Sequence, residues 1–354
     1  MSHLQDTESN QHEVHAGHEL ETGVLARVRE WIDIFPWLRL LRTLRMAGSP
    51  TMILMALLTL AIWSPVYHVI VGEVAAPSES TATSLQPSWP SAWVNEALWA
   101  SGWHRGSNGL RAVGGLLWTL FAWSFASLVF VRQGGLLTAG RPMIRFGTMG
   151  KSLLSRFVAA WIAGIVPLLC VAALAGMLWA LGWIAAWLPE WGIIQFPLAV
   201  LITLLAIPCG ILAFGGLVAI AFAWAAIANE RDPDALDALS RGYEYLYRRP
   251  VHVILYGLVS LALLWIVLLL IGGVAGAAAE IAMVVLDGAA APAMTRVFVL
   301  QIISLIPMAT AFAFAWGLIG GVYLLVRFDA GGQQVEDLWI PTPPAAAPLP
   351  TLPT

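Results

Sequence analysis

Residues 251–271 read VHVILYGLVSLALLWIVLLLI, a run of 21 residues without a charged side chain. An α-helix rises about 1.5 Å per residue, so about 20 apolar residues cover the ~30 Å hydrocarbon core of a bilayer. In lipid, only helices and closed barrels satisfy every backbone polar group, and this run lacks the alternation that is typical of barrel strands. The run therefore predicts a transmembrane helix.

Five more runs of this kind occur along the chain. The six predicted crossings lie near 51–71, 111–131, 157–187, 193–229, 251–271 and 297–326. The composition agrees, because 59% of the residues are hydrophobic and the mean hydropathy is +0.78, well above ordinary soluble domains. The sequence predicts an all-α polytopic membrane protein with one six-helix transmembrane domain over 50–329.

Lysine and arginine are distributed unevenly about these crossings. Fifteen lie before the first run or after the second, fourth and sixth, and only Arg105, Arg111 and Arg296 lie on the other side. Cytoplasmic loops carry the excess of basic residues, so both termini are predicted to be cytoplasmic. The first twenty residues are polar rather than signal-like, so the first crossing is expected to act as signal anchor in a bacterial inner membrane.

A basic amphipathic stretch, WLRLLRTLRM at 37–46, precedes the first crossing. A helix through it separates an apolar face of Trp37, Leu40, Leu41 and Leu44 from the flanking cations Arg39, Arg42 and Arg45. This pattern predicts a cytoplasmic interfacial helix within the segment 23–49. Its three arginines are candidate contacts for anionic lipid headgroups, at about 1 kcal/mol per basic residue.

Charge is densest at 230–249, ERDPDALDALSRGYEYLYRR. Asp232 and Pro233 suit a helix start, and Pro250 suits its end. The apolar face of this helix is Leu236, Leu239, Tyr243 and Leu246, and its opposite face is Asp237, Arg241, Glu244 and Arg248. Because acids and arginines alternate at helical spacing, the segment predicts a second cytoplasmic interfacial helix that pairs its own charges.

The same segment supplies further candidate lipid contacts. They are the arginines Arg241, Arg248 and Arg249 for headgroup phosphates and the aromatic side chains Tyr243, Tyr245 and Tyr247 as interfacial anchors. The alternative is that these residues only hold the loop on the cytoplasmic side, with no specific lipid bound. Membrane lipids, in particular anionic ones, are thus the predicted partners.

Two stretches that follow prolines are alike. ILMALLTLA at 53–61 follows Pro50, ILYGLVSLA at 254–262 follows Pro250, and five of their nine positions are identical. A basic stretch also precedes the third crossing, at 141–156. We therefore expect three helical hairpins, each introduced by an interfacial segment.

Small residues recur every four positions in two crossings. The last crossing has Ala309, Ala313, Gly317 and Gly321, and the third has Ala172, Gly176 and Ala180. Such stripes let helix backbones approach closely. They predict packing surfaces, either within the chain or between copies in a homo-oligomer or a larger membrane complex.

Two runs exceed the length that a membrane requires. Pro208 and Gly210 offer a break in the fourth, with 193–207 then lying on or partly entering the outer surface. Gly272, Gly273 and Gly276 offer another in the fifth, followed by an outer half-helix over 273–286 that bears Glu280. Interrupted helices often line membrane sites, so a transporter or channel for a small or amphiphilic molecule is the alternative function.

The two ends of the chain predict tails without regular structure. Residues 1–22 are polar and contain His12, His15 and His18, which predicts disorder, with binding of a transition metal as the alternative. Residues 330–354 are rich in proline and predict an extended tail.

Catalytic chemistry finds no support in the sequence. No nucleophile elbow, P-loop, dinucleotide fingerprint or HExxH motif occurs, and the crossings hold no ionisable residue at mid-depth. Cys170 and Cys209 lie in apolar runs and predict buried structural thiols rather than a disulfide. We therefore assign no catalytic, cofactor or metal residues, expect no enzyme activity and no cofactor, and find no support for nucleic-acid binding.

One resemblance arises within 230–249. Its carriers are Glu230 at the end of a crossing, then Ala238, Leu239, Ser240 and Arg241, then Tyr243, Tyr245 and Tyr247 before a new apolar run. This pattern resembles an internal segment of the membrane domain of some bacterial glycerophosphodiester phosphodiesterases and of its stand-alone relatives. The resemblance implies a six-crossing helical unit without the soluble catalytic domain. Together these observations predict an integral membrane protein that organises or senses lipids.

Overall fold

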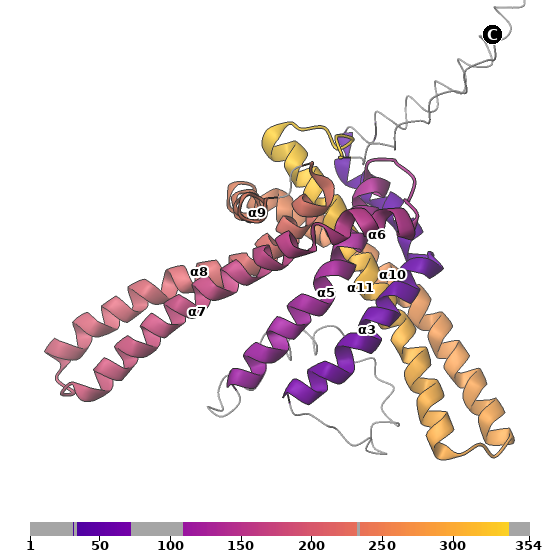
Figure 1. Cartoon of the computed structure of the whole chain (residues 1–354), viewed down its shortest axis with the longest axis horizontal. Helices are drawn as coiled ribbons and strands as arrows, with labels where there is room; N and C mark the ends of the chain where they lie inside the picture. Colours follow the sequence, from indigo (N-terminus) through magenta and orange to yellow (C-terminus); the bar gives the residue numbers. More distant parts are fainter. Residues whose placement is uncertain (1–30, 32–33, 72–108, 232–233, 340–354) are drawn as a thin grey trace, which may run out of the picture.

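The computed structural model describes residues 31, 34–71, 109–231 and 234–339, and within these the regular elements are all helices (Figure 1). Six are long and apolar enough to cross a membrane: α3 (Pro50–Val71), α5 (Gly109–Thr138), α7 (Phe157–Trp187), α8 (Gly192–Asn229), α10 (Pro250–Gly288) and α11 (Ala293–Gly331). The shorter elements are η1 (Pro36–Thr43), α2 (Leu44–Ala47), α6 (Phe146–Leu154) and α9 (Ala235–Arg248). The predicted all-α fold with six helices long and apolar enough to span a membrane is confirmed, whereas the orientation of the termini and the interfacial position of the shorter helices stay predictions.

The element order follows three similar units. Short elements precede each of the pairs α3/α5, α7/α8 and α10/α11, and the two long helices of each pair pack against one another. Figure 1 shows the pairs converging where α6 and α9 lie and diverging toward the opposite end. We call the first the charged end and the second, where the turns at 188–191 and 289–292 lie, the hairpin end.

The backbones of α5 and α11 touch near the charged end of the bundle. A Cβ atom added to Gly134 would lie 1.9 Å from the carbonyl oxygen of Gly317, and one added to Gly320 would lie 2.1 Å from that of Val131. Such distances leave no room for any side chain. Glycine is therefore required where these two helices cross.

The small-residue stripe of the last crossing lies inside this bundle. Ala309, Ala313, Gly317 and Gly321 are all buried. Gly317 also approaches Met46 of α2, and Gly321 approaches Thr138 of α5 and Leu40 of η1. The structure thus places the stripe on contacts within the chain, one of the two predicted alternatives.

The predicted helix breaks are absent from α8 and α10, so that expectation was wrong. α8 continues through Pro197 and Pro208, and α10 continues through Gly272, Gly273 and Gly276. A proline within a spanning helix is tolerated where neighbouring helices, hydroxyl side chains and local adjustments of the backbone satisfy the freed carbonyl, and a glycine costs only about 1 kcal/mol of helix propensity. α8 packs on α7, and α10 packs on α11.

The first interfacial segment forms a different helix from the predicted one. Residues 36–43 are 3₁₀-helical, so side chains three residues apart share a face. Leu40, Thr43 and Met46 are accordingly buried, whereas Leu41 and Leu44 of the predicted apolar face are exposed. The tighter helix thus keeps Trp37 and Leu40 of the expected face against the core and turns Leu41 and Leu44 away from it.

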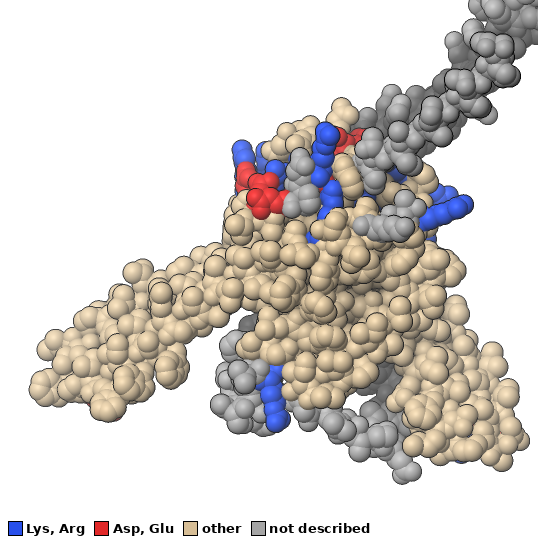
Figure 2. Space-filling view, in the orientation of Figure 1, with Lys and Arg blue, Asp and Glu red and all other residues tan. Residues whose placement is uncertain are grey.

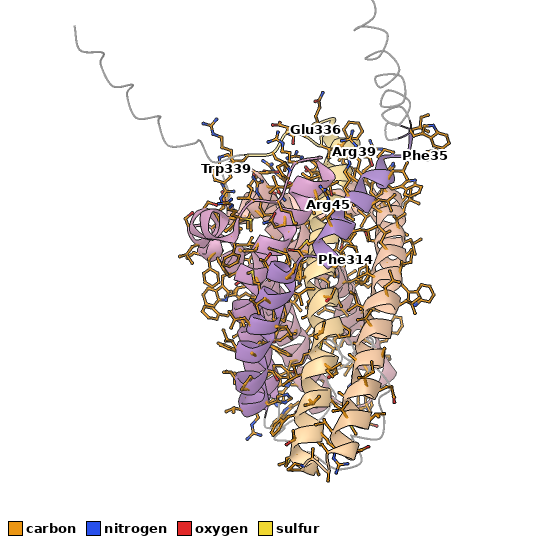
Figure 3. The ribbon with its side chains drawn as sticks, turned by 90° about the vertical axis from the view of Figure 1, so that its right-hand side faces the viewer. Phe35, Arg39, Arg45, Phe314, Glu336 and Trp339 are labelled. Carbon is orange, nitrogen blue, oxygen red and sulfur yellow. The ribbon has the colours of Figure 1, made fainter. Side chains whose placement is uncertain are left out.

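The C-terminal part of the fold extends further than the sequence suggested. α11 runs to Gly331, where Gly332 adopts a left-handed conformation (φ 70°) and ends the helix. The next residues, 332–339, lie on the charged end, where Figure 3 labels Glu336 and Trp339. Within this stretch, Val335 and Leu338 are buried. We call 332–339 the C-terminal segment. The predicted tail at 1–22, with its histidines, lies outside the described residues, as do residues 340–354 of the tail predicted over 330–354.

Candidate functional site at the charged end

Charged side chains gather at one end of the molecule. Figure 2 shows most Lys, Arg, Asp and Glu side chains there, above long stretches of other residues. The arrangement has three parts: buried arginines under the C-terminal segment, a pocket between α9 and the end of α11, and a rim of exposed arginines. Each part is built from residues that the ends of the apolar helices position.

Arg156 joins the ends of α7 and α8. It precedes α7 and donates hydrogen bonds to the carbonyl oxygens of Ile227 (2.6 Å), Glu230 (2.5 Å) and Arg231 (3.1 Å). Carbonyls at a helix C-terminus lack intrahelical donors and carry partial negative charge, so a guanidinium is a fitting cap. The same guanidinium lies 4.0 Å from the centre of the Trp339 ring.

Arg132 ties α5 to α8 and to the C-terminal segment. It donates to Asn229 Oδ1 at 3.1 Å and to the carbonyl oxygen of Trp339. Asn229 in turn donates to Ala225 O (2.9 Å) and accepts from the Trp339 amide (3.0 Å) through its own carbonyl. A fully buried cation is thus solvated by an amide and a backbone carbonyl rather than by water.

Arg327 holds the C-terminal segment from α11. Its Nη2 donates to the carbonyl oxygens of Gln334 (3.2 Å) and Asp337 (2.7 Å), while its buried Nε has no hydrogen-bond partner among the described residues. Arg141 donates to the Glu336 carbonyl, and Arg39 forms an ion pair with the Glu336 carboxylate. Arginines from four parts of the chain therefore converge on this segment.

The sequence did not reveal this buried layer. Arg132, Arg156 and Arg327 are only 2%, 5% and 3% exposed, yet they counted there as loop charges that mark the cytoplasmic side. The predicted second crossing stopped at 131, whereas α5 continues to Thr138 and includes Arg132. The sequence signal that could have identified Arg132, Arg156 and Arg327 as buried was their position directly beside an apolar run.

Glu230 is the carboxylate at which α8, α9 and α11 meet. Arg241 reaches Glu230 Oε2 at 2.5 Å and Asp237 Oδ2 at 2.7 Å, and the Tyr323 hydroxyl donates to Glu230 Oε1. Partial burial lowers the pKa of Arg241, but Glu230 and Asp237 more than offset this and raise it above its ordinary value. Arg241 is therefore a fixed cation.

The tyrosines of α9 mainly attach it to the rest of the chain. The hydroxyls of Tyr243 and Tyr247 donate to the Leu212 and Ile211 carbonyls of α8 (3.1 and 2.8 Å), and a Cβ on Gly215 would lie 2.4 Å from the Tyr247 hydroxyl. The Tyr245 ring lies 5.9 Å from that of Tyr323 on α11. Their predicted role as lipid anchors stays a prediction.

The ends of α9 follow the sequence with one shift. Asp232 and Pro233 lie outside the described residues, and the N-cap is Asp234, whose carboxylate accepts from the Leu236 amide at 3.0 Å. The helix ends at Arg248, and α10 begins at Pro250 as expected. Its two expected i,i+4 ion pairs are present, Asp237–Arg241 and Glu244–Arg248, both at 2.7 Å.

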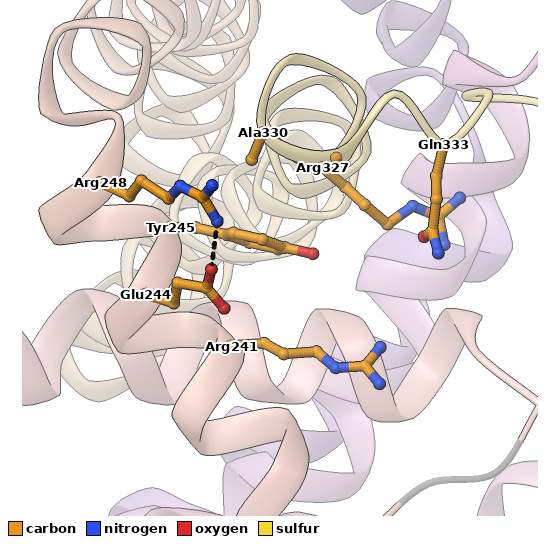
Figure 4. A pocket seen from close by; sticks show the side chains of 8 residues that line it. Arg241, Glu244, Tyr245, Arg248, Arg327, Ala330 and Gln333 are labelled. Atoms are coloured by element: carbon orange, nitrogen blue, oxygen red, sulfur yellow. Dashed lines mark hydrogen bonds and ion pairs between the residues drawn. The ribbon is translucent and has the colours of Figure 1, made fainter.

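A shallow pocket of about 220 Å³, open to solvent, lies between α9 and the end of α11 (Figure 4). It is lined by Arg241, Glu244, Tyr245 and Arg248 of α9, and by Arg327, Ala330, Gly331 and Gln333 of α11 and the C-terminal segment. The Glu244–Arg248 ion pair lies beside the Tyr245 ring, and all three side chains line the pocket. Both signs of charge therefore face one small space.

The predicted headgroup contacts fall into two groups. Arg39, Arg241 and Arg248 are engaged in ion pairs with carboxylates. Arg42, Arg45 and Arg249 are exposed and have no acidic partner among the described residues. Arg145 and Arg231, which the sequence did not single out, share this property. We call these five residues the rim: Arg42, Arg45, Arg145, Arg231 and Arg249. The sequence could not separate the groups, because the acids that pair Arg39 and Arg241 lie on other elements.

Six long apolar helices define the class of this chain as an integral membrane protein. No protein-family model matches it, and comparison with curated proteins and with solved structures found no match. The resemblance to the membrane domain of glycerophosphodiester phosphodiesterases therefore stays a prediction. In the described part of the chain, no three His, Cys, Asp or Glu side chains are grouped so that they could hold a metal ion, and Cys170 and Cys209 are free.

Proposed function

We propose that the protein is a non-enzymatic, membrane-organising protein that binds anionic lipid headgroups at its charged end. The observation that supports this is the rim of five exposed arginines without acidic partners among the described residues, placed where the apolar helices end. Each basic residue near an anionic surface contributes about 1 kcal/mol of attraction. An arginine already paired with a carboxylate contributes less, because the partner cancels its charge.

The proposal includes an orientation. The charged end faces the cytoplasm of a bacterial cell, since basic residues are retained on that side of an inner membrane. Anionic lipids of the cytoplasmic leaflet then lie within reach of the rim. The transporter alternative rested on interruptions near Pro208 and Gly272, and it loses this support because α8 and α10 are continuous.

Two adjacent arginines offer a matched test. Arg249 belongs to the rim, whereas Arg248 is paired with Glu244 at 2.7 Å, so Arg249→Gln and Arg248→Gln remove the same charge at the same place. The protein is reconstituted in nanodiscs with phosphatidylglycerol in a phosphatidylcholine background, and bound phosphatidylglycerol is measured by native mass spectrometry. We expect Arg249→Gln to lower it about fivefold, in line with about 1 kcal/mol, and Arg248→Gln to lower it less.

The combined variant Arg42→Gln/Arg45→Gln/Arg249→Gln provides the larger effect. Its loss of phosphatidylglycerol should exceed that of any single substitution and should diminish as salt is added, because exposed charges are screened. Equal binding by this variant and the unmodified protein would show that the rim does not bind lipid. Equal losses in Arg248→Gln and Arg249→Gln would show a response to net charge alone.

A further inference from the structure

We propose that η1 and the start of α2 insert an exposed apolar row of side chains into the lipid surface at the charged end, between the acyl chains and the headgroups. The inference deepens the proposed function and rests on it in one respect, because both require the charged end to lie at a membrane surface. It goes further in assigning a contact with acyl chains, whereas the rim binds only headgroup charge.

The 3₁₀ geometry of η1 divides this segment into three rows. With three residues per turn, side chains at i, i+3, i+6 and i+9 lie above one another. The first row packs against the core, the second is apolar and at least partly exposed, and the third holds arginines. The rows are Trp37, Leu40, Thr43 and Met46; Phe35, Leu38, Leu41 and Leu44; and Arg39, Arg42 and Arg45.

The first row fixes the orientation of the segment. Leu40 and Met46 fill the space above two glycines of α11, since a Cβ atom on Gly321 would lie 2.7 Å from Leu40 Cδ2 and one on Gly317 would lie 2.5 Å from Met46 Sδ. Thr43 Oγ1 donates to the Leu40 carbonyl at 2.6 Å, at the three-residue spacing of this helix. Because this row is held in place, the other two rows cannot turn toward the bundle.

The second row is an uncovered apolar surface. Phe35, Leu41 and Leu44 are 40%, 41% and 37% exposed, and Leu38 between them is partly exposed. Figure 3 shows Phe35 at the outer edge of the charged end, away from the buried Phe314. Neighbouring apolar side chains that share one exposed face are unfavourable in water and mark an interaction surface.

The third row and the start of α3 favour a bilayer as the partner. No Asp or Glu occurs between residues 35 and 50, and Arg42 and Arg45 are exposed, so lipid phosphates are the complementary charge. The spanning helix α3 begins at Pro50, directly after this segment. An amphipathic helix at such a place lies in the plane of the interface, with its apolar face at the boundary between headgroups and acyl chains.

Spin labels on adjacent residues of the second and third rows test the insertion. Each label is attached to a single cysteine in a Cys170→Ala/Cys209→Ala background, because both native cysteines are free. All four labelled positions are exposed, so a label displaces no packed side chain. The substitutions form two matched pairs: Leu41→Cys with Arg42→Cys, and Leu44→Cys with Arg45→Cys.

The labelled full-length protein is reconstituted in nanodiscs of phosphatidylcholine and phosphatidylglycerol. Power-saturation electron paramagnetic resonance then compares collisions with oxygen, which concentrates among acyl chains, and with a water-soluble nickel chelate. We expect the Leu41→Cys and Leu44→Cys labels to collide more with oxygen, and the Arg42→Cys and Arg45→Cys labels to collide more with nickel.

Three results would overturn the insertion. The first is a predominance of nickel at Leu41→Cys and Leu44→Cys, which would place the apolar row in water. The second is an equal balance of the two reagents within each pair, because the rows would then not be distinct. The third is protection of Leu41→Cys and Leu44→Cys from both reagents, which would show that a protein surface, such as a second copy of the chain, covers the row.

The insertion and the headgroup binding fail independently. Nanodiscs of phosphatidylcholine alone lack the ligand of the rim, yet the oxygen signal of Leu41→Cys should persist, because packing on Gly317 and Gly321 sets the orientation. A nickel signal there together with intact phosphatidylglycerol binding would reject only the insertion. Equal phosphatidylglycerol binding by the unmodified chain and Arg42→Gln/Arg45→Gln/Arg249→Gln, with the oxygen signal retained, would reject only the binding of headgroups by the rim.

Discussion

The two ends of this bundle are held together in opposite ways. At the charged end, α5 and α11 touch through backbone atoms at Gly134 and Gly317, and Arg132, Arg156 and Glu230 link α5, α7, α8, α9 and α11. At the hairpin end, the pairs α7/α8 and α10/α11 stand apart (Figure 1). Cohesion between the three units is therefore concentrated at one end.

The difference shows what holds helices together in an apolar solvent. In lipid, apolar side chains gain little by meeting one another, so association depends on close backbone packing and hydrogen bonds. The charged end has both. In the outer part of the arm formed by α7 and α8, a Cβ atom added to Gly176, Gly182 or Gly192 would have no neighbouring atom within 4 Å, and apolar side chains such as Ile193, which is 89% exposed, are uncovered.

The helix α8 of this arm is longer than a bilayer requires. The 38 residues of α8 span about 57 Å at 1.5 Å per residue, against about 30 Å of hydrocarbon or about 43 Å with the headgroup regions. A helix of this length either tilts or extends beyond the bilayer, and the same holds for α10 and α11, which have 39 residues each. Exposed tryptophans near the tip, Trp179, Trp183, Trp187 and Trp191, suit the opposite interface.

The largest expected effect is that of a single methyl group at the helix crossing. Gly134→Ala places a Cβ atom 1.9 Å from the Gly317 carbonyl oxygen, so α5 and α11 must separate, whereas a Cβ on Gly272 has no atom within 4 Å. We expect Gly134→Ala to lower the free energy of unfolding by about 3 kcal/mol or more. Gly272→Ala should be neutral or slightly stabilising, because alanine favours the helix.

Both variants are measured by unfolding in SDS-containing mixed micelles. Similar stabilities for Gly134→Ala and Gly272→Ala would show that the crossing is not the point of cohesion, and the contrast between the two ends would fail.

The second effect comes from the buried arginine layer. Arg132→Gln leaves Asn229 Oδ1 and the Trp339 carbonyl without their donor, which costs about 1–3 kcal/mol when acceptors are buried. Hydrogen exchange of residues 332–339 should accelerate, because the C-terminal segment loses its attachment. Arg145→Gln removes the same charge from an exposed position and should stay within about 0.5 kcal/mol. Equal exchange in the two variants would contradict a structural role for Arg132.

Much of the fold could be predicted from the sequence, because an apolar run that is long enough to cross a bilayer must form a helix to satisfy its backbone hydrogen bonds. The six crossings, α9 with its ion pairs, and the three-unit order follow from run length and spacing. The tilt and divergence of the pairs did not follow, since any apolar face satisfies lipid equally. Two similar small-residue stripes illustrate this: Gly317 lies against Gly134, whereas a Cβ atom added to Gly176 on the arm would have no neighbouring atom within 4 Å.

The site was less accessible from the sequence. Spacing predicted the pair Glu244–Arg248, because both members lie on one helix. It could not predict that Arg241 also binds Glu230, or that Trp339 covers Arg132 and Arg156, because these contacts join segments far apart in the chain. Local patterns identify which residues are charged, but only the tertiary fold decides which of them remain free.

The attachment of α9 to α8 and α11 should weaken at alkaline pH. Burial raises the pKa of Tyr243 and Tyr245 above the ordinary value of about 10. The folded state thus holds these protons more tightly than the unfolded chain, so the stabilisation is complete below pH about 10 and is lost as the pH rises further. Proteolysis within α9 should increase as the pH rises above about 10, and the variant Tyr243→Phe/Tyr245→Phe should lose most of this dependence. An identical pH profile in that variant would assign the effect to other groups.

The smallest expected change in stability comes from replacing one of two arginines that are almost equally exposed but lie at opposite ends of the bundle. Arg296 at the hairpin end is 37% exposed and pairs with Asp287 alone at 2.6 Å, whereas Arg241 is 36% exposed and joins Glu230 and Asp237. An isolated exposed pair contributes up to about 1 kcal/mol, so Arg296→Gln should change stability by less than that, and added salt should remove the difference. Arg241→Gln should cost more, because Glu230 would keep Tyr323 as a partner but lose its counter-charge. If the two substitutions cost the same in SDS unfolding, the link that Arg241 makes to Glu230 would add nothing to a simple ion pair, and cohesion at the charged end would rest on the glycine crossing and on Arg132 and Arg156.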